Sequence, residues 1–108
     1  MPFKQVSPVF YVSGQLTLDD VRDAATQGFK TIICNRPDNE EADQLPSNIV
    51  QEQAEALGMK FVYIPVSTAG VTANDSVRMR AVLNAMPSPV LAYCRSGARS
   101  GKVFELAQ

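Results

Sequence analysis

Two stretches of this chain repeat one plan thirty residues apart, and this spacing limits the fold more than any other feature of the sequence. Residues 28–33 (GFKTII) and 58–63 (GMKFVY) each combine a helix-stopping glycine, a lysine and an apolar strand. That distance is the length of one strand–helix unit rather than of a stacked repeat. The pattern therefore predicts strands that alternate with helices.

Turn and cap signals place the other strands and helices around these two stretches. Strands are expected at residues 3–6, 9–13, 30–34, 60–64 and 90–93, and helices at 17–28, 47–58, 75–85 and 100–108. Thr17, Ser47 and Asn74 are the expected N-caps, because a short polar side chain can accept a hydrogen bond from the first turn. This order predicts an α/β fold with a mostly parallel central sheet, helices on both faces and right-handed crossovers.

Length and charge limit the number of domains and the kinds of partner that are expected. The 108 residues, 45% of them hydrophobic, are enough for one core, so residues 1–108 are expected to form a single domain. Ten basic and eleven acidic residues give a net charge of −1, which suits neither nucleic acid nor an anionic membrane. A small, locally bound anion is the expected ligand. The loops at residues 35–36, 67–68 and 94–99 follow parallel strands and are expected to line one cleft.

Cysteine and histidine usage limits the chemistry further. Cys34 and Cys94 end two separate apolar runs, and the chain has no histidine. A structural disulfide and a zinc or iron site are therefore not expected, and no cofactor is predicted. The first residues lack the basic and apolar segments of a secretion signal, and no run of eighteen apolar residues occurs. A cytoplasmic location is the resulting expectation.

Residues 93–100 (YCRSGARS) place Cys94 between an apolar strand and the start of a helix. Unpaired N–H groups converge at such a turn, the helix start carries partial positive charge, and Arg95 and Arg99 add full charges. Each effect favours a thiolate over a thiol. Cys94 is therefore the predicted nucleophile.

The simpler interpretation of Cys94 is a small core residue at a strand end. Its neighbours argue for chemistry instead. Gly97 permits a positive φ angle, Arg99 can point at a bound anion, and Ser100 can hydrogen-bond the sulfur. The residues predicted to bind substrate are those of the loop itself, namely Arg95, Ser96, Gly97 and Ala98, together with Arg36, which follows the apolar run at residues 30–34.

This octapeptide resembles the active-site loop of rhodanese-type sulfurtransferases, in which a Tyr-Cys-Arg-x-Gly-x-Arg-Ser run forms a cradle of backbone amides around a persulfide. It also resembles, less closely, the phosphate-binding loop of cysteine-dependent phosphatases. That loop is longer by one residue, since only four residues separate Cys94 from Arg99. Those phosphatases also commonly have a histidine before the cysteine, where this chain has Tyr93.

The resemblance extends along most of the chain. Residues 10–15, 35–38 with Glu40, 63–66 and the Cys94 loop look, in that order, like the phosphatase-like domain of the beta-lactamase-hydrolase-like family. The resemblance implies a dual-specificity-phosphatase-like fold. It leaves the activity open, because some members resemble sulfurtransferases that are fused to, or work beside, a metallo-beta-lactamase-like persulfide dioxygenase.

The residues favour sulfur transfer over phosphate hydrolysis. A phosphatase needs an acid to protonate its leaving alcohol, and the loop at residues 65–70 contains no carboxylate. Asp38 and Asp75 are remote candidates with structural explanations, one in a turn and one in the first turn of a helix. Sulfur transfer needs no acid, because its leaving group departs as a stable anion. The shorter loop also suits one terminal sulfur better than a phosphoryl group.

The sequence therefore predicts a sulfurtransferase that moves sulfane sulfur from thiosulfate or glutathione persulfide to a thiol or cyanide through a Cys94 persulfide. Its predicted catalytic residues are Cys94, Arg99 and Ser100. A cysteine-dependent phosphatase with a Cys94 phosphocysteine is the first alternative, and a non-catalytic anion-binding module is the second. Arg36 could neutralise a donor in the cleft or pair with nearby acids, while Cys34 is expected to be an inert buried thiol.

Overall fold

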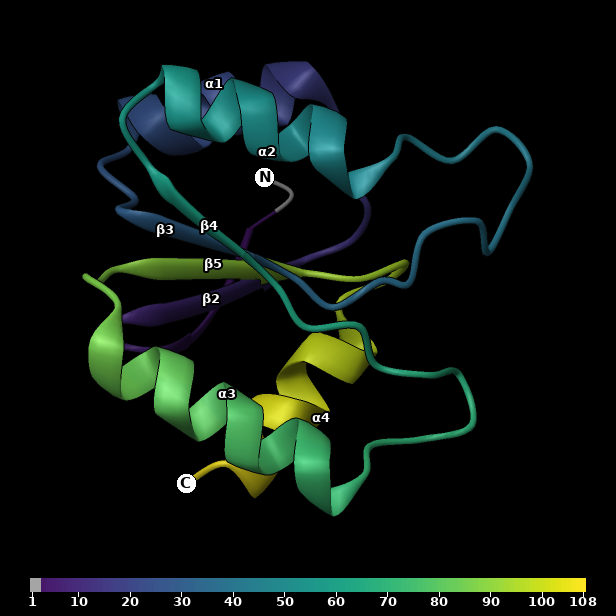
Figure 1. Cartoon of the computed structure of the whole chain (residues 1–108). Coiled ribbons are helices and arrows are strands. Elements are labelled where there is room, and N and C mark those ends of the chain that lie inside the picture. The colour runs from purple at the N-terminus through teal and green to yellow at the C-terminus, as the bar shows by residue number, and fades with distance from the viewer. Residues whose placement is uncertain (1–2) are drawn as a thin grey trace.

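The computed structural model describes residues 3–108 and contains a five-stranded sheet (Figure 1). Met1 and Pro2 belong to the expected domain and lie outside the described residues. The elements are, in order, β1 (Lys4–Ser7), β2 (Phe10–Ser13), α1 (Leu18–Thr26), β3 (Thr31–Cys34), α2 (Ser47–Ala56), β4 (Lys60–Tyr63), α3 (Ala73–Ala85), β5 (Val90–Tyr93) and α4 (Ala98–Leu106). Within the described residues, none of these helices is long and apolar enough to cross a membrane.

The strands lie in the order β1-β2-β5-β3-β4, so β5 occupies the centre of the sheet. β2, β5, β3 and β4 are parallel, and β1 pairs antiparallel with β2. The last residues of the four parallel strands, Ser13, Tyr93, Cys34 and Tyr63, are in register. The loops that follow these strands therefore leave the sheet at one edge, which brings residues far apart in the sequence together.

Helices cover both faces of the sheet, as the sequence predicts. Figure 1 shows α1 and α2 on one side and α3 and α4 on the other. Alternate side chains of β3 enter different cores: Ile32 packs in the core that contains Val21 and Val50, and Ile33 in the core that contains Met79 and Val103. The apolar pattern of this strand therefore reflects burial on both faces.

The helices α1 and α3 begin with the same reciprocal cap. The hydroxyls of Thr17 and Thr72 accept hydrogen bonds from the N–H groups of Asp20 and Asp75, whose carboxylates accept the N–H of each cap. The sequence predicts Thr17 correctly but places the cap of α3 two residues too late, at Asn74. The reason is that Thr72 stands at the right distance from Asp75 for a capping box.

The starts of α2 and α4 differ in detail from the predicted ones. Ser47 is the first helical residue of α2 rather than its cap, because its N–H and hydroxyl donate to the Asp38 carboxylate at 2.8 and 2.7 Å. The helix α4 begins at Ala98 rather than Ser100, since Gly97 adopts φ 96° and turns the chain directly into the helix. Arg99 and Ser100 therefore lie in the first turn of α4.

Candidate active site

The loop between β5 and α4 folds back over the sulfur of Cys94. The N–H of Gly97 donates a hydrogen bond to Cys94 Sγ at 3.0 Å, and Cys94 is 1% exposed. A side chain at Gly97 would be strained at its φ of 96°, and its Cβ would lie 3.4 Å from the Ser13 carbonyl oxygen. Glycine at this position therefore lets the loop amide reach the sulfur.

The segment after β2 holds the loop from the other side. Gln15 N–H donates to the Arg95 carbonyl oxygen at 3.3 Å. The backbone of Gly14 passes so close that a Cβ there would lie 3.0 Å from the same oxygen. The loop is thus fixed by backbone contacts between segments about eighty residues apart, which a local sequence pattern does not reveal.

The sulfur of Cys94 is surrounded by hydrogen-bond donors. Burial opposes ionisation of the thiol, but the N–H groups of Ser100, Ser96 and Gly97 together with the Ser100 hydroxyl outweigh it and hold the pKa of Cys94 below its ordinary value. The Ser100 hydroxyl is fully buried and has no close hydrogen-bond partner within residues 3–108, so its O–H can turn towards a thiolate. The site therefore favours a nucleophilic sulfur.

Arg99 reaches the same site from the first turn of α4. Its Nη1 donates to Glu40 Oε2 at 2.6 Å and to the Val66 carbonyl oxygen at 2.8 Å, and its Nη2 donates to Glu40 Oε1 at 3.0 Å. The hydrogen bonds to Glu40 raise the pKa of Arg99 despite its burial, and the nearby Cys94 sulfur adds to the effect. Arg99 is therefore a fixed positive charge beside the nucleophile.

Two of the five N–H groups of Arg99 donate to no oxygen atom of the protein within the described residues. A guanidinium carries five N–H bonds, and Glu40 and Val66 use both on Nη1 and one on Nη2. The Nε–H and the second Nη2–H share one edge of the planar group and donate to no oxygen within the described residues, and the nearby Cys94 sulfur contributes a hydrogen bond to the raised pKa of Arg99. Such an edge can donate two parallel hydrogen bonds to a single anion.

Glu40, which the sequence suggests only as a possible partner of Arg36, also belongs to the site. Its side chain is 16% exposed and bridges two arginines, because Oε1 accepts from both Arg99 Nη2 and Arg36 Nε at 3.0 Å. Hydrogen bonds from Arg99 hold the pKa of Glu40 below its usual range, and Arg36 contributes to the same shift. The neighbouring Asn39 has φ 68°, a left-handed conformation that asparagine tolerates and that marks this turn in the sequence.

Arg36 lies behind Glu40 rather than at the nucleophile. Its Nε, Nη2 and Nη1 donate to Glu40 at 3.0 Å, Glu41 at 2.7 Å and Gln15 Oε1 at 2.9 Å. All three nitrogens are therefore engaged, which matches the pairing with nearby acids that the sequence leaves open. Arg95 is exposed at the rim, with its Nε 3.5 Å from Glu41.

The other residues singled out in the sequence make contacts that stabilise the fold rather than contacts at the active site. Cys34 packs in the core beneath α1 and α2, where burial raises the pKa of its thiol to about 11. Asp38 binds the start of α2, and Asp75 belongs to the capping box of α3. Within residues 3–108, no group of three or more histidine, cysteine, aspartate or glutamate side chains could hold a metal ion.

The expected cleft of three loops is formed only in part. The loops after β3 and β5 meet at the contact of Glu40 with Arg99, and the loop after β4 contributes the Val66 carbonyl oxygen. Ser67 and Thr68 are exposed, because they turn away in a bend that Gly70 N–H closes on the Ser67 carbonyl oxygen at 3.1 Å. A hollow of about 670 Å³ is lined by residues 96–98 of the Cys94 loop together with residues of β1, β2 and α4.

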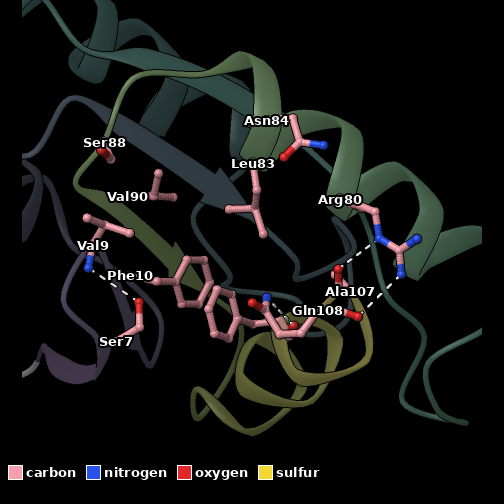
Figure 2. Close-up of a pocket in the computed structure, with 11 residues that line it drawn as sticks. Ser7, Val9, Phe10, Arg80, Leu83, Asn84, Ser88, Val90, Ala107 and Gln108 are labelled. Atoms are coloured by element: carbon pink, nitrogen blue, oxygen red, sulfur yellow. Dashed lines mark hydrogen bonds between the residues drawn. The ribbon is translucent and has the colours of Figure 1, made fainter.

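A separate cavity of about 300 Å³ lies at the first residues of β2 and β5, on the face covered by α3 and α4 (Figure 2). Its floor is the stacked pair Phe10 and Phe104, whose ring centroids are 4.0 Å apart. Arg80 is at its rim, where Nε donates to the Ala107 carbonyl oxygen at 2.9 Å. None of the residues predicted to be catalytic or substrate-binding lines this cavity, so the candidate site is the Cys94 loop.

Solved structures of phosphatases share this fold. A crystal structure of a candidate phosphatase from Neisseria meningitidis matches with a TM-score of 0.90 and 35% identity, over 96% of this chain and 74% of that one. The core catalytic domain of the PP-IP phosphatase SIW14 from S. cerevisiae matches with a TM-score of 0.74 and 18% identity, over 95% of this chain and 62% of that one, which shows the fold alone. The predicted dual-specificity-phosphatase-like fold is confirmed.

Proteins that are similar to this chain in sequence identify its family. The beta-lactamase hydrolase-like protein of Agrobacterium fabrum is 33% identical over 97 residues, which are 90% of this chain but only 22% of that protein. These comparisons support the phosphatase alternative better than the sulfurtransferase that the sequence analysis favours. The family model of the beta-lactamase hydrolase-like protein, phosphatase-like domain, matches residues 2–108. The chain therefore belongs to this family of phosphatase-like domains, as the sequence resemblance indicates.

Proposed function

We propose that this domain is a cysteine-dependent hydrolase of the phosphatase type. The Cys94 thiolate attacks the phosphorus of a small phosphorylated substrate, the bond to the leaving group breaks, and a phosphocysteine forms. Water then attacks phosphorus, releases inorganic phosphate and returns the thiolate. The observation that carries the proposal is an activated sulfur beside an arginine edge with two free N–H donors.

The loop and Arg99 would divide the work of holding the phosphoryl group. Backbone N–H groups of Ser96, Gly97 and Ser100 converge on the sulfur, where they stabilise the attacking thiolate and would donate to phosphoryl oxygens bound against it. The free edge of Arg99 would bind two phosphoryl oxygens. A purely anion-binding module would leave the lowered pKa of Cys94 without a purpose, so a catalytic role is preferred.

The site limits which kinds of leaving group can depart. Glu40 is the carboxylate in contact with Arg99, and its lowered pKa keeps it ionised and unable to donate a proton. Asp38 and Asp75 are engaged at helix starts. Substrates whose leaving group departs without a proton, such as aryl phosphates, acyl phosphates and phosphoanhydrides, should therefore react much faster than alkyl phosphates.

A series of aryl phosphates with leaving groups of increasing acidity tests the proposal. Turnover should rise steeply with leaving-group acidity, and rapid acid quenching should trap phosphate on the peptide that contains Cys94. Cys94→Ser should lose both signals, whereas Cys34→Ser, the matched control, should keep them. Absence of hydrolysis and of trapped phosphocysteine in the unmodified protein would rule out the phosphatase activity.

Sulfur transfer is the second candidate, and the length of the loop is the observation in its favour. Only four residues separate Cys94 from Arg99, and the Gly97 amide approaches Sγ to 3.0 Å, so the cradle is small. Cys94 would attack the outer sulfur of thiosulfate or glutathione persulfide, release sulfite or glutathione as the anion, and pass the sulfur to a thiol or cyanide. A metallo-beta-lactamase-like persulfide dioxygenase would be a fitting partner for that activity.

Side-by-side assays separate the two candidates. Thiosulfate with cyanide, glutathione persulfide and an aryl phosphate are compared at equal enzyme concentration, with mass analysis of Cys94 for added sulfur or phosphate. Insertion of one glycine after Gly97 should widen the loop, raise vanadate affinity and lower any sulfur transfer. Efficient sulfur transfer without phosphate hydrolysis would assign the domain to the second candidate.

A further inference from the structure

A continuous set of polar side chains connects the nucleophile loop to the protein interior. Gln15 accepts a hydrogen bond from Arg36 at 2.9 Å, Arg36 donates to Glu40 at 3.0 Å, and Glu40 binds Arg99 through both carboxylate oxygens. These residues belong to the loops after β2 and β3 and to α4. The orientation of Arg99 thus depends on groups that are far from the substrate.

Arg36 is the rigid member of this set. Its side chain is 4% exposed, and each of its three nitrogens donates to a different residue: Gln15, Glu40 or Glu41. Rotation of the guanidinium would break several charge-assisted hydrogen bonds in a buried place. The Glu40 carboxylate, which has several rotamers, is therefore held in one orientation by Arg36.

We propose that Arg36 is a positioning residue that sets the anion affinity of the Cys94 loop through Glu40. By fixing Glu40 against the Nη1 and Nη2 ends of Arg99, it leaves the Nε–Nη2 edge of Arg99 open to the substrate. Arg36 thus acts without touching the substrate. The proposal rests on the proposed function only in that Cys94 is a nucleophile that meets an anion beside Arg99.

Two alkylating reagents measure this effect without any assumption about turnover. The thiolate attacks the carbon of either iodoacetate or iodoacetamide and releases iodide, but only iodoacetate carries a negative charge that Arg99 can bind. The ratio of their rates at Cys94 reports anion binding, and the iodoacetamide rate alone reports the thiolate. Mass analysis of the tryptic peptide at residues 81–95 isolates Cys94 from Cys34.

Arg36→Met should lower the iodoacetate-to-iodoacetamide ratio about tenfold, as expected when a charge-assisted hydrogen bond is misaligned. The iodoacetamide rate above the thiol pKa should stay near that of the unmodified protein. Glu40→Gln should lower the ratio similarly. The double variant should have the same ratio as Glu40→Gln alone, because both changes act through the contact between Glu40 and Arg99. Arg22→Met is the matched control and should keep the ratio, since Arg22 is exposed on α1, pairs with Asp19 and contacts neither Arg36 nor Arg99.

Arg36→Lys guards against a folding failure of the methionine variant. Lysine keeps the buried positive charge, but one ammonium group cannot reproduce the three directions of the guanidinium, so an intermediate ratio is expected. A folded Arg36→Lys or Arg36→Met variant with the ratio of the unmodified protein would overturn the proposal, as would additive losses in the double variant. Failure of the phosphatase and sulfurtransferase assays would overturn the proposed function and leave this ratio test intact.

Discussion

Cys34 and Cys94 occupy neighbouring positions at the same edge of the sheet and have opposite chemistry. Cys34 is the last residue of β3 and pairs in register with Tyr93, so Cys94 lies one residue beyond it on the central strand. Both residues are 1% exposed. Nevertheless the pKa of Cys34 is raised to about 11, whereas the pKa of Cys94 is lowered.

The difference shows that hydrogen-bond donors, not burial, decide which cysteine is a nucleophile. Burial dominates at Cys34, where the Tyr93 hydroxyl and the Arg36 backbone compensate only weakly. At Cys94 burial is again the largest single influence, but donors from Ser96, Gly97 and Ser100 together exceed it. The turn into a helix supplies these donors, and the loop after β3 does not begin a helix until Ser47.

Exchange of each cysteine for serine is the strongest test of this contrast. Cys94→Ser should lower turnover by at least roughly a thousandfold, because a hydroxyl is far less acidic than a thiol and cannot carry the covalent intermediate. Cys34→Ser should retain most of the activity. Steady-state rates and circular dichroism should be measured for both variants. If Cys34→Ser were as inactive as Cys94→Ser while folded, the assignment of one nucleophile would be wrong.

Removal of the Arg99 guanidinium should have the next largest effect. Arg99→Ala should weaken binding of phosphate or vanadate by about a hundredfold, the loss expected for a two-donor contact with an anion, and should raise the pKa of Cys94. Arg95→Ala is the control, because this exposed side chain pairs with Glu41 at the rim and should affect binding modestly. Isothermal titration and the pH dependence of alkylation provide the measurements. Equal alkylation profiles for Arg99→Ala and the unmodified protein would exclude Arg99 from activation of the thiol.

The two thiols should also give opposite pH dependences of stability. The raised pKa of Cys34 means that its contribution is complete below pH 9.0, its ordinary pKa, and is lost as the pH rises to about 11. This loss should be roughly 2–3 kcal/mol in the free energy of unfolding. The lowered pKa of Cys94 has the reverse sign, so its contribution is present above the ordinary pKa and is lost as the pH falls through the folded value.

Urea unfolding at a series of pH values would measure these contributions. Cys34→Ser should remove the alkaline loss of stability between pH 9 and pH 11, apart from what other groups contribute. Cys94→Ser should instead remove a gain of stability that accompanies ionisation of the thiol. The same alkaline loss in Cys34→Ser as in the unmodified protein would show that Cys34 titrates normally in the fold.

The contrast between the two cysteines also marks how far the sequence could be interpreted. The octapeptide around Cys94 is local, so strand end, glycine turn and helix start could be predicted from neighbouring residues. The partner of Arg99 could not, since Glu40 lies 59 residues away and meets Arg99 only after β3 and β5 pair. For the same reason the two possible roles of Arg36 could not be distinguished before its buried contacts with Glu40 and Glu41 were known.

The helix starts show a second limit, which concerns competition among caps. Asn74 is as good a cap as Thr72 by residue type alone, but Thr72 can exchange two hydrogen bonds with Asp75. Ser47 is engaged by Asp38, nine residues earlier in the chain, and therefore enters the helix. Element order and type could be predicted from periodicity, whereas exact boundaries depended on such side-chain partners.

The smallest effect is expected at the Ser100 hydroxyl, which is one of four donors to the Cys94 sulfur. Ser100→Ala removes one donor from the Cys94 sulfur but leaves the N–H groups of Ser96, Gly97 and residue 100 in place. The pKa of Cys94 should therefore rise only part of the way towards its ordinary value, and turnover should fall by about tenfold or less. Stability should change little, because one donor to the sulfur is removed and three N–H donors remain. Iodoacetamide profiles against pH and thermal unfolding would measure both quantities. A loss of activity as large as that of Cys94→Ser, with the thiol pKa unchanged, would instead place the Ser100 hydroxyl in contact with the reacting substrate, for example as the donor that assists the leaving thiolate when the intermediate breaks down.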